Sequence, residues 1–511
     1  MLQLIIIAGI SSLILIGGIT DYYVSAQTDD YAETDADLGQ DGFLKGELTV
    51  FDDDYTVELF ANGLDFPTTI DFIGNDLLVL EKNTGKVIRI NENGEIDKEP
   101  VLVVPVYNGN ESGLLGIATQ DNDVFLYFTE SFEGSSPEKP NKNTVYHYSW
   151  DGDNLTNPIL IKELSADFWS HNGGVFAKGQ SEEIYFVIGD DNKRTIFQND
   201  PSVPSSNETG SIFKIHTDDD NRVELFAVGI RNSFGLAVDP LTGNLWQTEN
   251  GMQVYDEINL VENRFNSGWS AITGPSDRVD AITDPVLFEK GIQSLEGFVY
   301  SDPEFSWYNA VGSTAIAFPD MTNFAKYQDW LFVGDFNHGK IYKFQLNSDR
   351  TKLVFSNQAL KDLVLDPKDI DNYPEINDEL VFAQFPGGIT DIKFAHDIMY
   401  VVVPFADGYG KNTGAIYKIY SNQAILPPLK QYNAGASHDE ITCKPGLMPL
   451  MKYSEYIVCV SPNTGSILIN RTGFTEIVLT DVQLPDKDLT NANLTGVDLS
   501  GKDLTNANLT G

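Results

Sequence analysis

The sequence predicts an all-β protein built mainly as a six-bladed β-propeller. First, residues 47–424 contain short β-rich segments separated by Gly, Asn, Asp and Pro, with almost no long 3.6-residue pattern. Second, a loose three-strand unit recurs six times, on average roughly 64 residues apart. Third, the pentad VELFA occurs at Val57–Ala61 and again at Val223–Ala227. A sandwich needs no sixfold unit and a β-helix repeats at a shorter period, so the repeat favours a propeller with insertions.

Each unit opens with an apolar strand after a turn and ends with a third strand. The six units begin near Phe66, Gly113, Gly173, Phe234, Gly312 and Gly388, and their third strands read KVIRI, TVYHY, SIFKI, DEINLV, KIYKF and AIYKI. In a propeller the first strand of each blade lines the central channel, and loops at one end form the functional face. Polar residues beside the first strands are therefore the candidate site residues.

The charge of the chain excludes several classes of partner. Its 511 residues include 75 Asp and Glu against 33 Lys and Arg, a formal net charge of −42. Such an acidic chain repels phosphate backbones and anionic membranes, so we expect no nucleic-acid partner. The same charge favours divalent cations. With 41% hydrophobic residues, the chain can bury a core and is not a disordered polymer.

The N-terminal segment predicts export. Leu4–Ile19 is almost wholly apolar but short for a membrane span, and Val24-Ser25-Ala26 resembles a signal-peptide cleavage pattern. No Lys or Arg precedes Lys45, so the basic region of a signal peptide is missing. We interpret residues 1–26 as a signal peptide or a membrane anchor and residues 27–46 as an acidic linker. The protein is expected to be secreted or anchored at the cell surface, outside the cytoplasm.

Two smaller modules follow the propeller. Residues 425–475 contain Cys443 and Cys459, which outside the cell would form a disulfide; a reduced pair is the alternative. From residue 476 to 511 the chain continues a five-residue period of leucines: Leu479, Leu484, Leu489, Leu494, Leu499, Leu504 and Leu509. This tail resembles pentapeptide-repeat proteins, which form a quadrilateral β-helix. Because so few repeats stack poorly alone, the tail is a cap, a frayed segment or the start of a longer array.

Four polar segments interrupt strands that should be apolar. They are Glu111–Gly116, Ser170–Gly174 with the later Gly189-Asp190-Asp191, Gly229–Asn232, and Glu249–Met252 with Asp256–Asn259 and Gly268-Trp269. Taken singly, each is explained by turn chemistry, and a lone His171 by a structural histidine. Their order and spacing together resemble the glucose/sorbosone dehydrogenase family of soluble quinoproteins, over roughly residues 56–420. The resemblance implies the same six-bladed propeller.

The resemblance also implies a reaction. In that family pyrroloquinoline quinone (PQQ) and Ca²⁺ lie at the channel mouth, and an aldose is oxidised at C1 to its lactone by hydride transfer to the quinone. By motif, His171 would be the general base and Arg231 would stabilise developing negative charge. The implied cofactor-binding positions are Glu111, Arg231, Asn232, Asn337 and Thr390. The implied Ca²⁺ ligands are the carbonyls of Gly251 and Met252, with the carboxylates of Asp256 and Glu257 nearby.

The sequence departs from the family where the quinone carboxylates should bind. A family lysine is replaced by Asn337, and two family arginines by Gly388 and Thr390; His338 and Lys340 lie nearby. Two hypotheses therefore stay open. The chain is a PQQ-dependent sugar dehydrogenase with an external electron acceptor, or a non-catalytic, calcium-stabilised surface propeller that binds carbohydrate or protein. A calcium-dependent lactonase fits less well, because its carboxylate–Asn metal set cannot be assembled from these motifs.

Overall fold

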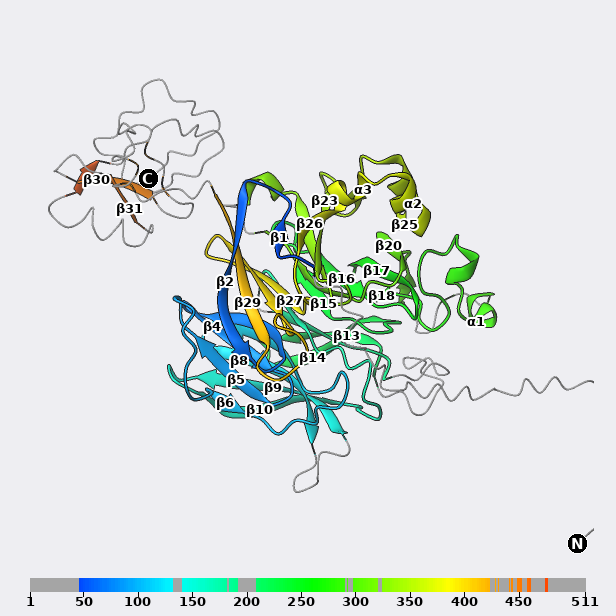
Figure 1. Cartoon of the computed structure of the whole chain (residues 1–511). Helices are drawn as coiled ribbons and strands as arrows, with labels where there is room; N and C mark the ends of the chain where they lie inside the picture. Colours follow the sequence, from blue (N-terminus) through cyan, green and yellow to red (C-terminus); the bar gives the residue numbers. More distant parts are fainter. Residues whose placement is uncertain are drawn as a thin grey trace, which may run out of the picture. The chain divides into compact units, whose positions relative to one another are not determined.

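The computed structural model describes residues 46–131, 140–181, 183–191, 208–289, 292, 297–319 and 324–422, and parts of 428–476 (Figure 1). The predicted signal or anchor at 1–26, nearly all of the 27–46 linker and the tail beyond 476 lie outside the described residues. In the described part, no helix is long and apolar enough to cross a membrane.

The described strands form six sheets of four to six strands and a seventh of three. The first strands are β3 (Pro67–Ile73), β7 (Leu114–Gln120), β11 (Phe176–Lys178), β15 (Gly235–Val238), β21 (Ser313–Ala317) and β27 (Asp391–Ala395). The second strands are β4 (Asp76–Glu81), β8 (Asp123–Ser131), β12 (Glu183–Ile188), β16 (Leu245–Glu249), β22 (Trp330–Asp335) and β28 (Ile398–Val403). The third strands are β5 (Lys86–Ile90), β9 (Pro140–Trp150), β13 (Ser211–His216), β17 (Val254–Val261), β23 (Lys340–Leu346) and β29 (Gly414–Ser421). Each third strand contains the segment that the sequence assigned to it.

The outer strands are β6 (Leu102–Val103), β10 (Leu155–Leu164), β14 (Arg222–Val228), β20 (Phe305–Asn309), β26 (Val381–Gln384) and β2 (Tyr55–Leu64). Short strands extend three sheets: β1 (Thr49–Val50), β18 (Phe265–Asn266), β19 (Val299–Tyr300), β24 (Leu353–Val354) and β25 (Val364–Leu365). The described helices are short: η1 (Val279–Ala281), α1 (Pro285–Glu289), η2 (Ala325–Tyr327), η3 (Gln358–Asp362), α2 (Pro367–Asn372) and α3 (Ile376–Leu380). The all-β prediction is therefore confirmed.

The sheets are arranged like the blades of a propeller. Each first strand contacts the next, in the order β3, β7, β11, β15, β21, β27 and back to β3. They enclose a cavity of about 10 Å³, room for about one water molecule. The ring is tied together by β2, which supplies the outer strand of the last sheet by pairing antiparallel with β29 (Figure 1). Residues near the start of the propeller thus bind residues near its end.

Apolar contacts between neighbouring sheets form the core. Second strands such as β4 and β12 are buried on both faces and read as continuous apolar runs. Leu78 and Leu80 of β4 pack with Leu126 and Phe128 of β8. Because this packing fixes each sheet against the next, the loops at the strand ends are held by a rigid frame.

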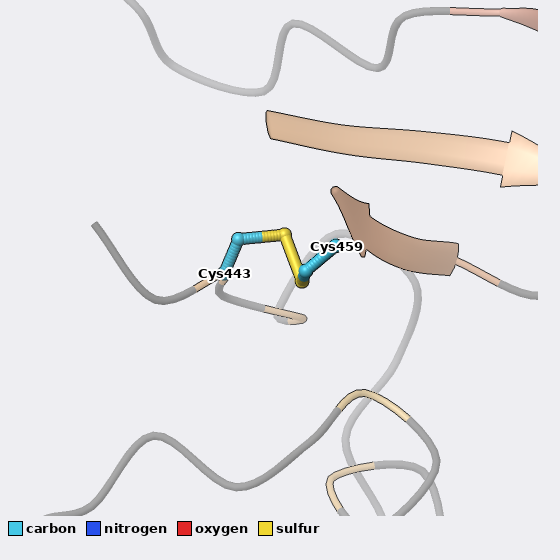
Figure 2. The surroundings of a disulfide bond; sticks show 2 residues. All are labelled: Cys443 and Cys459. Atoms are coloured by element: carbon cyan, nitrogen blue, oxygen red, sulfur yellow. A yellow bond between two sulfur atoms is a disulfide. The ribbon is translucent and has the colours of Figure 1, made fainter. Parts of the chain in front are cut away.

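The C-terminal module contains the predicted disulfide. Cys443 and Cys459 are joined, with their Cα atoms 5.4 Å apart (Figure 2). Cys459 lies in β31 (Ile457–Val460), which pairs with β30 (Met448–Lys452), and β30 pairs in turn with β32 (Phe474–Glu476). The disulfide therefore ties the preceding chain to an outer strand of a three-stranded antiparallel sheet.

Candidate functional site

The predicted site residues gather at one edge of the six sheets. In an antiparallel pair, the start of the first strand and the end of the second lie at the same edge. Glu111 and His171 precede the first strands β7 and β11, and Asn232 precedes β15. Gly251 follows the second strand β16. We call this the site edge.

Glu111 links three sheets at the site edge. Its Oε2 accepts a hydrogen bond from the backbone N–H of His171 at 2.5 Å and another from Nδ2 of Asn232 at 3.1 Å. These bonds bring together residues that lie 60 and 121 positions from Glu111 in the sequence. Glu111 thus fixes the positions of His171 and Asn232 relative to each other.

His171 is paired with a buried carboxylate. Its Nδ1 lies 2.5 Å from Oδ1 of Asp190, and Oδ2 of Asp190 accepts a hydrogen bond from Trp269 Nε1 at 2.6 Å. Asp190 is fully buried. Nε2 of His171 makes no hydrogen bond to any residue in the described ranges. An Nδ1–H donated to Asp190 would leave the Nε2 lone pair available to accept a proton.

Arg231 lies beside this pair. Its Nη1 donates to the carbonyl of Asn250 at 2.8 Å, and its guanidinium lies 5.5 Å from the centre of the Trp269 ring. The backbone also joins the two groups, because Asp190 N–H donates to the Arg231 carbonyl at 2.8 Å. His171, Arg231 and the loop after β16 are therefore brought together.

The predicted calcium ligands fall into two groups in the structure. Asp256 Oδ1 accepts from Gly251 N–H at 2.9 Å, and Oδ2 from the N–H groups of Val311 and Ser313 at 2.9 Å. This carboxylate therefore shapes the turn that presents Gly251 and Met252. Glu257 is the next residue on β17, and consecutive strand residues point to opposite faces. The side chains of Asp256 and Glu257 therefore leave β17 on opposite faces.

Glu257 instead lies opposite another buried acid. Glu249 and Glu257 are directly paired across β16 and β17, and both are buried. Burial raises the pKa of both carboxyl groups, and the charge of Glu257 raises that of Glu249 further. Glu249 also accepts from the backbone N–H of Arg231 at 2.6 Å, so it helps to place that residue. Among the described residues, no three His, Cys, Asp or Glu side chains form a metal-binding group.

The positions expected to bind the quinone carboxylates are small or neutral. A Cβ on Gly388 would lie 2.1 Å from the carbonyl oxygen of Phe336, so an arginine would not fit without a backbone shift. Thr390 Oγ1 donates to the carbonyl of Pro67 at 3.1 Å. Asn337 is exposed. His338 is close by, with Nδ1 3.5 Å from Asp335 Oδ2.

Lys82 adds a buried cation to the site edge. It follows β4, and its Nζ donates to Asn83 Oδ1 at 3.2 Å and lies 5.0 Å from the centre of the Phe66 ring. Burial lowers the pKa of Lys82 to about 8, although the charge of Glu111 acts in the opposite direction. A single lysine after a strand forms no pattern, so no motif marks Lys82 in the sequence.

Asp190 and Trp269 are two further site residues whose roles could not be predicted from the sequence. Both stood in recognised motifs, Asp190 in the Gly-Asp that follows β12 and Trp269 in the Gly-Trp that follows β18. The motifs indicated that Asp190 and Trp269 belong to the site. Their contacts with His171 and Arg231 depend on how neighbouring sheets pack, which the motifs do not show.

Known proteins are similar to the propeller and to the tail of this chain. The family model for glucose/sorbosone dehydrogenases matches residues 64–396, and a pentapeptide-repeat model matches eight copies in residues 474–511. A quinoprotein glucose dehydrogenase B of Acinetobacter calcoaceticus is 27% identical over 237 residues, covering 40% of this chain and 49% of that protein. An aldose sugar dehydrogenase of Escherichia coli is 23% identical over 318 residues, covering 58% of this chain and 81% of that protein. The match to the first of these relatives spans about half of its length.

Solved structures show the same fold. A crystal structure of a glucose dehydrogenase aligns with a TM-score of 0.54 at 21% identity, covering 71% of this chain and 99% of that one. The PQQ-bound aldose sugar dehydrogenase of Streptomyces coelicolor aligns with a TM-score of 0.51 at 20% identity, covering 72% of this chain and 98% of that one.

Proposed function

Because the chain belongs to the glucose/sorbosone dehydrogenase family, we propose that it oxidises an aldose at C1 to the lactone, with PQQ and Ca²⁺ as cofactors. The observation that carries the proposal is the pair formed by His171 and Asp190, with their ring nitrogen and carboxylate oxygen 2.5 Å apart at the site edge. A base held in one tautomer beside a cation is what removal of a proton from a sugar hydroxyl requires.

Each site residue of this chain has its own role in the proposed oxidation. His171 Nε2 accepts the proton of the anomeric hydroxyl, while Asp190 stabilises the imidazolium that results. Arg231 stabilises negative charge that develops on oxygen nearby. Glu111 and Trp269 keep these groups in place. When bound, PQQ supplies the acceptor for the hydride of C1, and Ca²⁺ supplies a Lewis acid.

The residues present fit the quinone in part. Asn232 Oδ1 is buried and has no hydrogen-bond partner in the described ranges, so it can accept from a bound group. Arg231 and Asn232 are suited to bind the quinone ring of PQQ, at the end away from its carboxylates. At the carboxylate end, Asn337, Gly388 and Thr390 stand in place of the family's lysine and arginines. We therefore expect PQQ to bind more weakly than the family pattern implies.

We extend the proposal to architecture and location. The six sheets of four to six strands support a six-bladed propeller, one sheet to a blade. The Gly251 and Met252 carbonyls are the proposed Ca²⁺ ligands, held by the bond from Gly251 N–H to Asp256. The disulfide supports export, since disulfides persist in oxidising compartments.

Reconstitution with quinone tests the proposal. The full chain would be mixed with Ca²⁺ and PQQ, quinone binding followed by absorbance, and dye reduction measured with several aldoses. Binding with sugar-dependent reduction is the expected result. No binding at micromolar quinone would reject the dehydrogenase and favour the non-catalytic propeller, which the close packing at Gly388 already favours.

A further inference from the structure

An exposed tryptophan lies two residues before the proposed base on the site edge. The side chain of Trp169 is 45% exposed. Its ring stacks on that of Phe168, with the two ring centres 4.3 Å apart and the planes inclined by 26°. Consecutive Cα atoms are about 3.8 Å apart, so the Cα atoms of Trp169 and His171 lie within about 8 Å of each other. We call Phe168 and Trp169 the aromatic platform.

The backbone of the platform is joined to the residue that places His171. The carbonyl of Trp169 accepts the N–H of Glu111 at 3.1 Å and the hydroxyl of Ser112 at 3.4 Å. The carboxylate of Glu111 in turn accepts the N–H of His171 at 2.5 Å. Because Glu111 bonds to the backbone on both sides of Ser170, the platform and the proposed base are held together at the site edge.

A buried carboxylate supports the segment that carries the platform. The Asp191 side chain is buried, since the whole residue is only 2% exposed. Its Oδ2 accepts from Ser165 Oγ at 2.8 Å and from the N–H of Asp167 at 3.1 Å. Its Oδ1 accepts from the N–H of Phe168 at 2.8 Å. The aromatic platform is therefore a fixed part of the site edge.

One short segment after β12 supports both the base and the platform. Asp190 pairs with His171 at 2.5 Å, and the next residue, Asp191, bonds to Phe168. A single exposed apolar residue on a protein surface needs no such support. An aromatic ring that is held rigidly in solvent, however, loses little conformational freedom when a ligand binds. The platform is therefore preorganised for binding.

The surroundings of the platform favour an uncharged sugar as its ligand. One face of a sugar ring presents mainly C–H groups, which pack against the electron-rich face of an aromatic ring. Asp167 and Glu163 are exposed on the same segment, and the chain has a net charge of −42. Carboxylates accept hydrogen bonds from sugar hydroxyls but repel an anionic ligand. A neutral glycan therefore fits better than an acidic one or the carboxylates of PQQ.

The exposure of the residues indicates which sugar unit the platform contacts. His171 is 8% exposed and Trp169 is 45% exposed, so the platform lies outward from the base. A glycan is attached to its reducing-end unit through a position other than C1. When the C1 hydroxyl of that unit lies at the imidazole, the next unit extends away from the base towards solvent.

We propose that the aromatic platform binds the sugar unit next to the one that is oxidised. The preferred substrate is then the reducing end of a neutral oligosaccharide, and Trp169 determines this specificity. The position of the oxidised unit rests on the proposed function, because it is defined by His171. Binding at the platform itself needs neither quinone nor hydride transfer, so its test is done without quinone.

Isothermal titration calorimetry of the full chain measures the binding of short glycans. The neutral probes are cellotriose, maltotriose and laminaritriose, and glucose and trigalacturonic acid are the comparisons. We expect at least one neutral trisaccharide to bind about tenfold more tightly than glucose, and the acidic one not to bind. Trp169→Ala should weaken binding of that trisaccharide by about tenfold and leave glucose unchanged. Trp169→Phe, which keeps a flat ring, should recover part of the loss.

Tyr373→Ala is the matched control, because Tyr373 is 44% exposed and lies between α2 and α3. It should bind every probe as the wild type does, and the thermal midpoints of all variants are compared to detect unfolding. Equal affinities of wild type and Trp169→Ala for each trisaccharide, or no preference over glucose, would overturn the proposal. A Trp169→Ala variant that loses affinity for PQQ but not for trisaccharides would assign the platform to the cofactor instead. Trisaccharide binding that depends on Trp169 in a chain that binds no quinone would reject only the oxidation.

Discussion

His171 Nδ1 and Asp190 Oδ1 lie 2.5 Å apart, although 19 residues separate them in the sequence. The contact forms because His171 precedes the loop into β11 and Asp190 follows the end of β12, and these two strands are antiparallel neighbours. A third residue completes the arrangement, since Trp269 donates to the other oxygen of Asp190. The carboxylate is thereby held through both oxygens, and it fixes the imidazole through Nδ1.

Replacing Asp190 by Asn should lower kcat by about 10²- to 10⁴-fold while quinone binding changes little. The amide would favour the wrong tautomer of His171 and would not stabilise the imidazolium. Steady-state dye reduction and an absorbance titration measure the two quantities. Asp123→Asn is the matched control, because Asp123 is an exposed carboxylate that also contacts a histidine, His147, at 2.6 Å. An Asp190→Asn enzyme with normal kcat would contradict the assignment of His171 as base.

Arg231→Met should weaken quinone binding by about 10- to 100-fold, since one charge-assisted hydrogen bond contributes roughly 1.5–3 kcal/mol. The titration is done at fixed Ca²⁺, and the midpoint of unfolding is compared to exclude general destabilisation. Arg222→Met provides the control, because Arg222 is exposed and pairs with Asp219. Equal affinities for Arg231→Met and wild type would remove Arg231 from the cofactor site.

Asn337→Lys should tighten quinone binding by about tenfold, because it returns a cation to the position where the family has one. Asn337 is exposed, so the longer side chain can be accommodated. Ser348→Lys adds the same charge beyond the far end of β23 and controls for the change in net charge. If both variants tighten binding equally, the effect is general electrostatics and the carboxylates do not lie near Asn337.

Lys82→Met should stabilise the protein at pH 7, and the gain should disappear as the pH rises. The pKa of Lys82 is lowered from 10.5 to about 8, so the folded state binds fewer protons than the unfolded state between these values. The cost of the buried charge is full below pH 8 and is lost as the pH rises towards 10.5. The gain is on the order of 3 kcal/mol at most.

Chemical denaturation of Lys82→Met and wild type across pH 7–10.5 measures this difference. The exposed Lys98→Met serves as the control, and its difference from wild type should not vary with pH. A destabilised Lys82→Met at pH 7 would show that the contacts of the ammonium with Asn83 and Phe66 outweigh the cost of burial.

Cys443→Ser should loosen the three-stranded sheet of the C-terminal module without changing the propeller. The disulfide closes a loop with a sequence separation of 16 residues, a constraint that contributes about 3 kcal/mol. Amide exchange in β30 and β31 should become faster, while exchange in β4 and β8 stays unchanged. Faster exchange in both regions would mean that the disulfide also stabilises the propeller.

The sequence predicted the strands well and the contacts poorly. The six third strands were read correctly because their alternation and flanking turns are local properties. Glu111, His171, Arg231 and Asn232 were found because their motifs are short and ordered. Asp256 and Glu257 were grouped as ligands of one ion, whereas the structure turns them to opposite faces of β17.

By itself, the sequence determined an all-β chain with six repeated units, an acidic surface, a family motif order and a five-residue leucine period. These are properties of composition and spacing, which need no knowledge of distant contacts. Only the tertiary structure decided that Asp190 and Trp269 hold His171, that Gly388 packs against Phe336, and that Glu249 lies opposite Glu257. The physical reason is that strand ends far apart in the chain meet only when the ring of sheets closes.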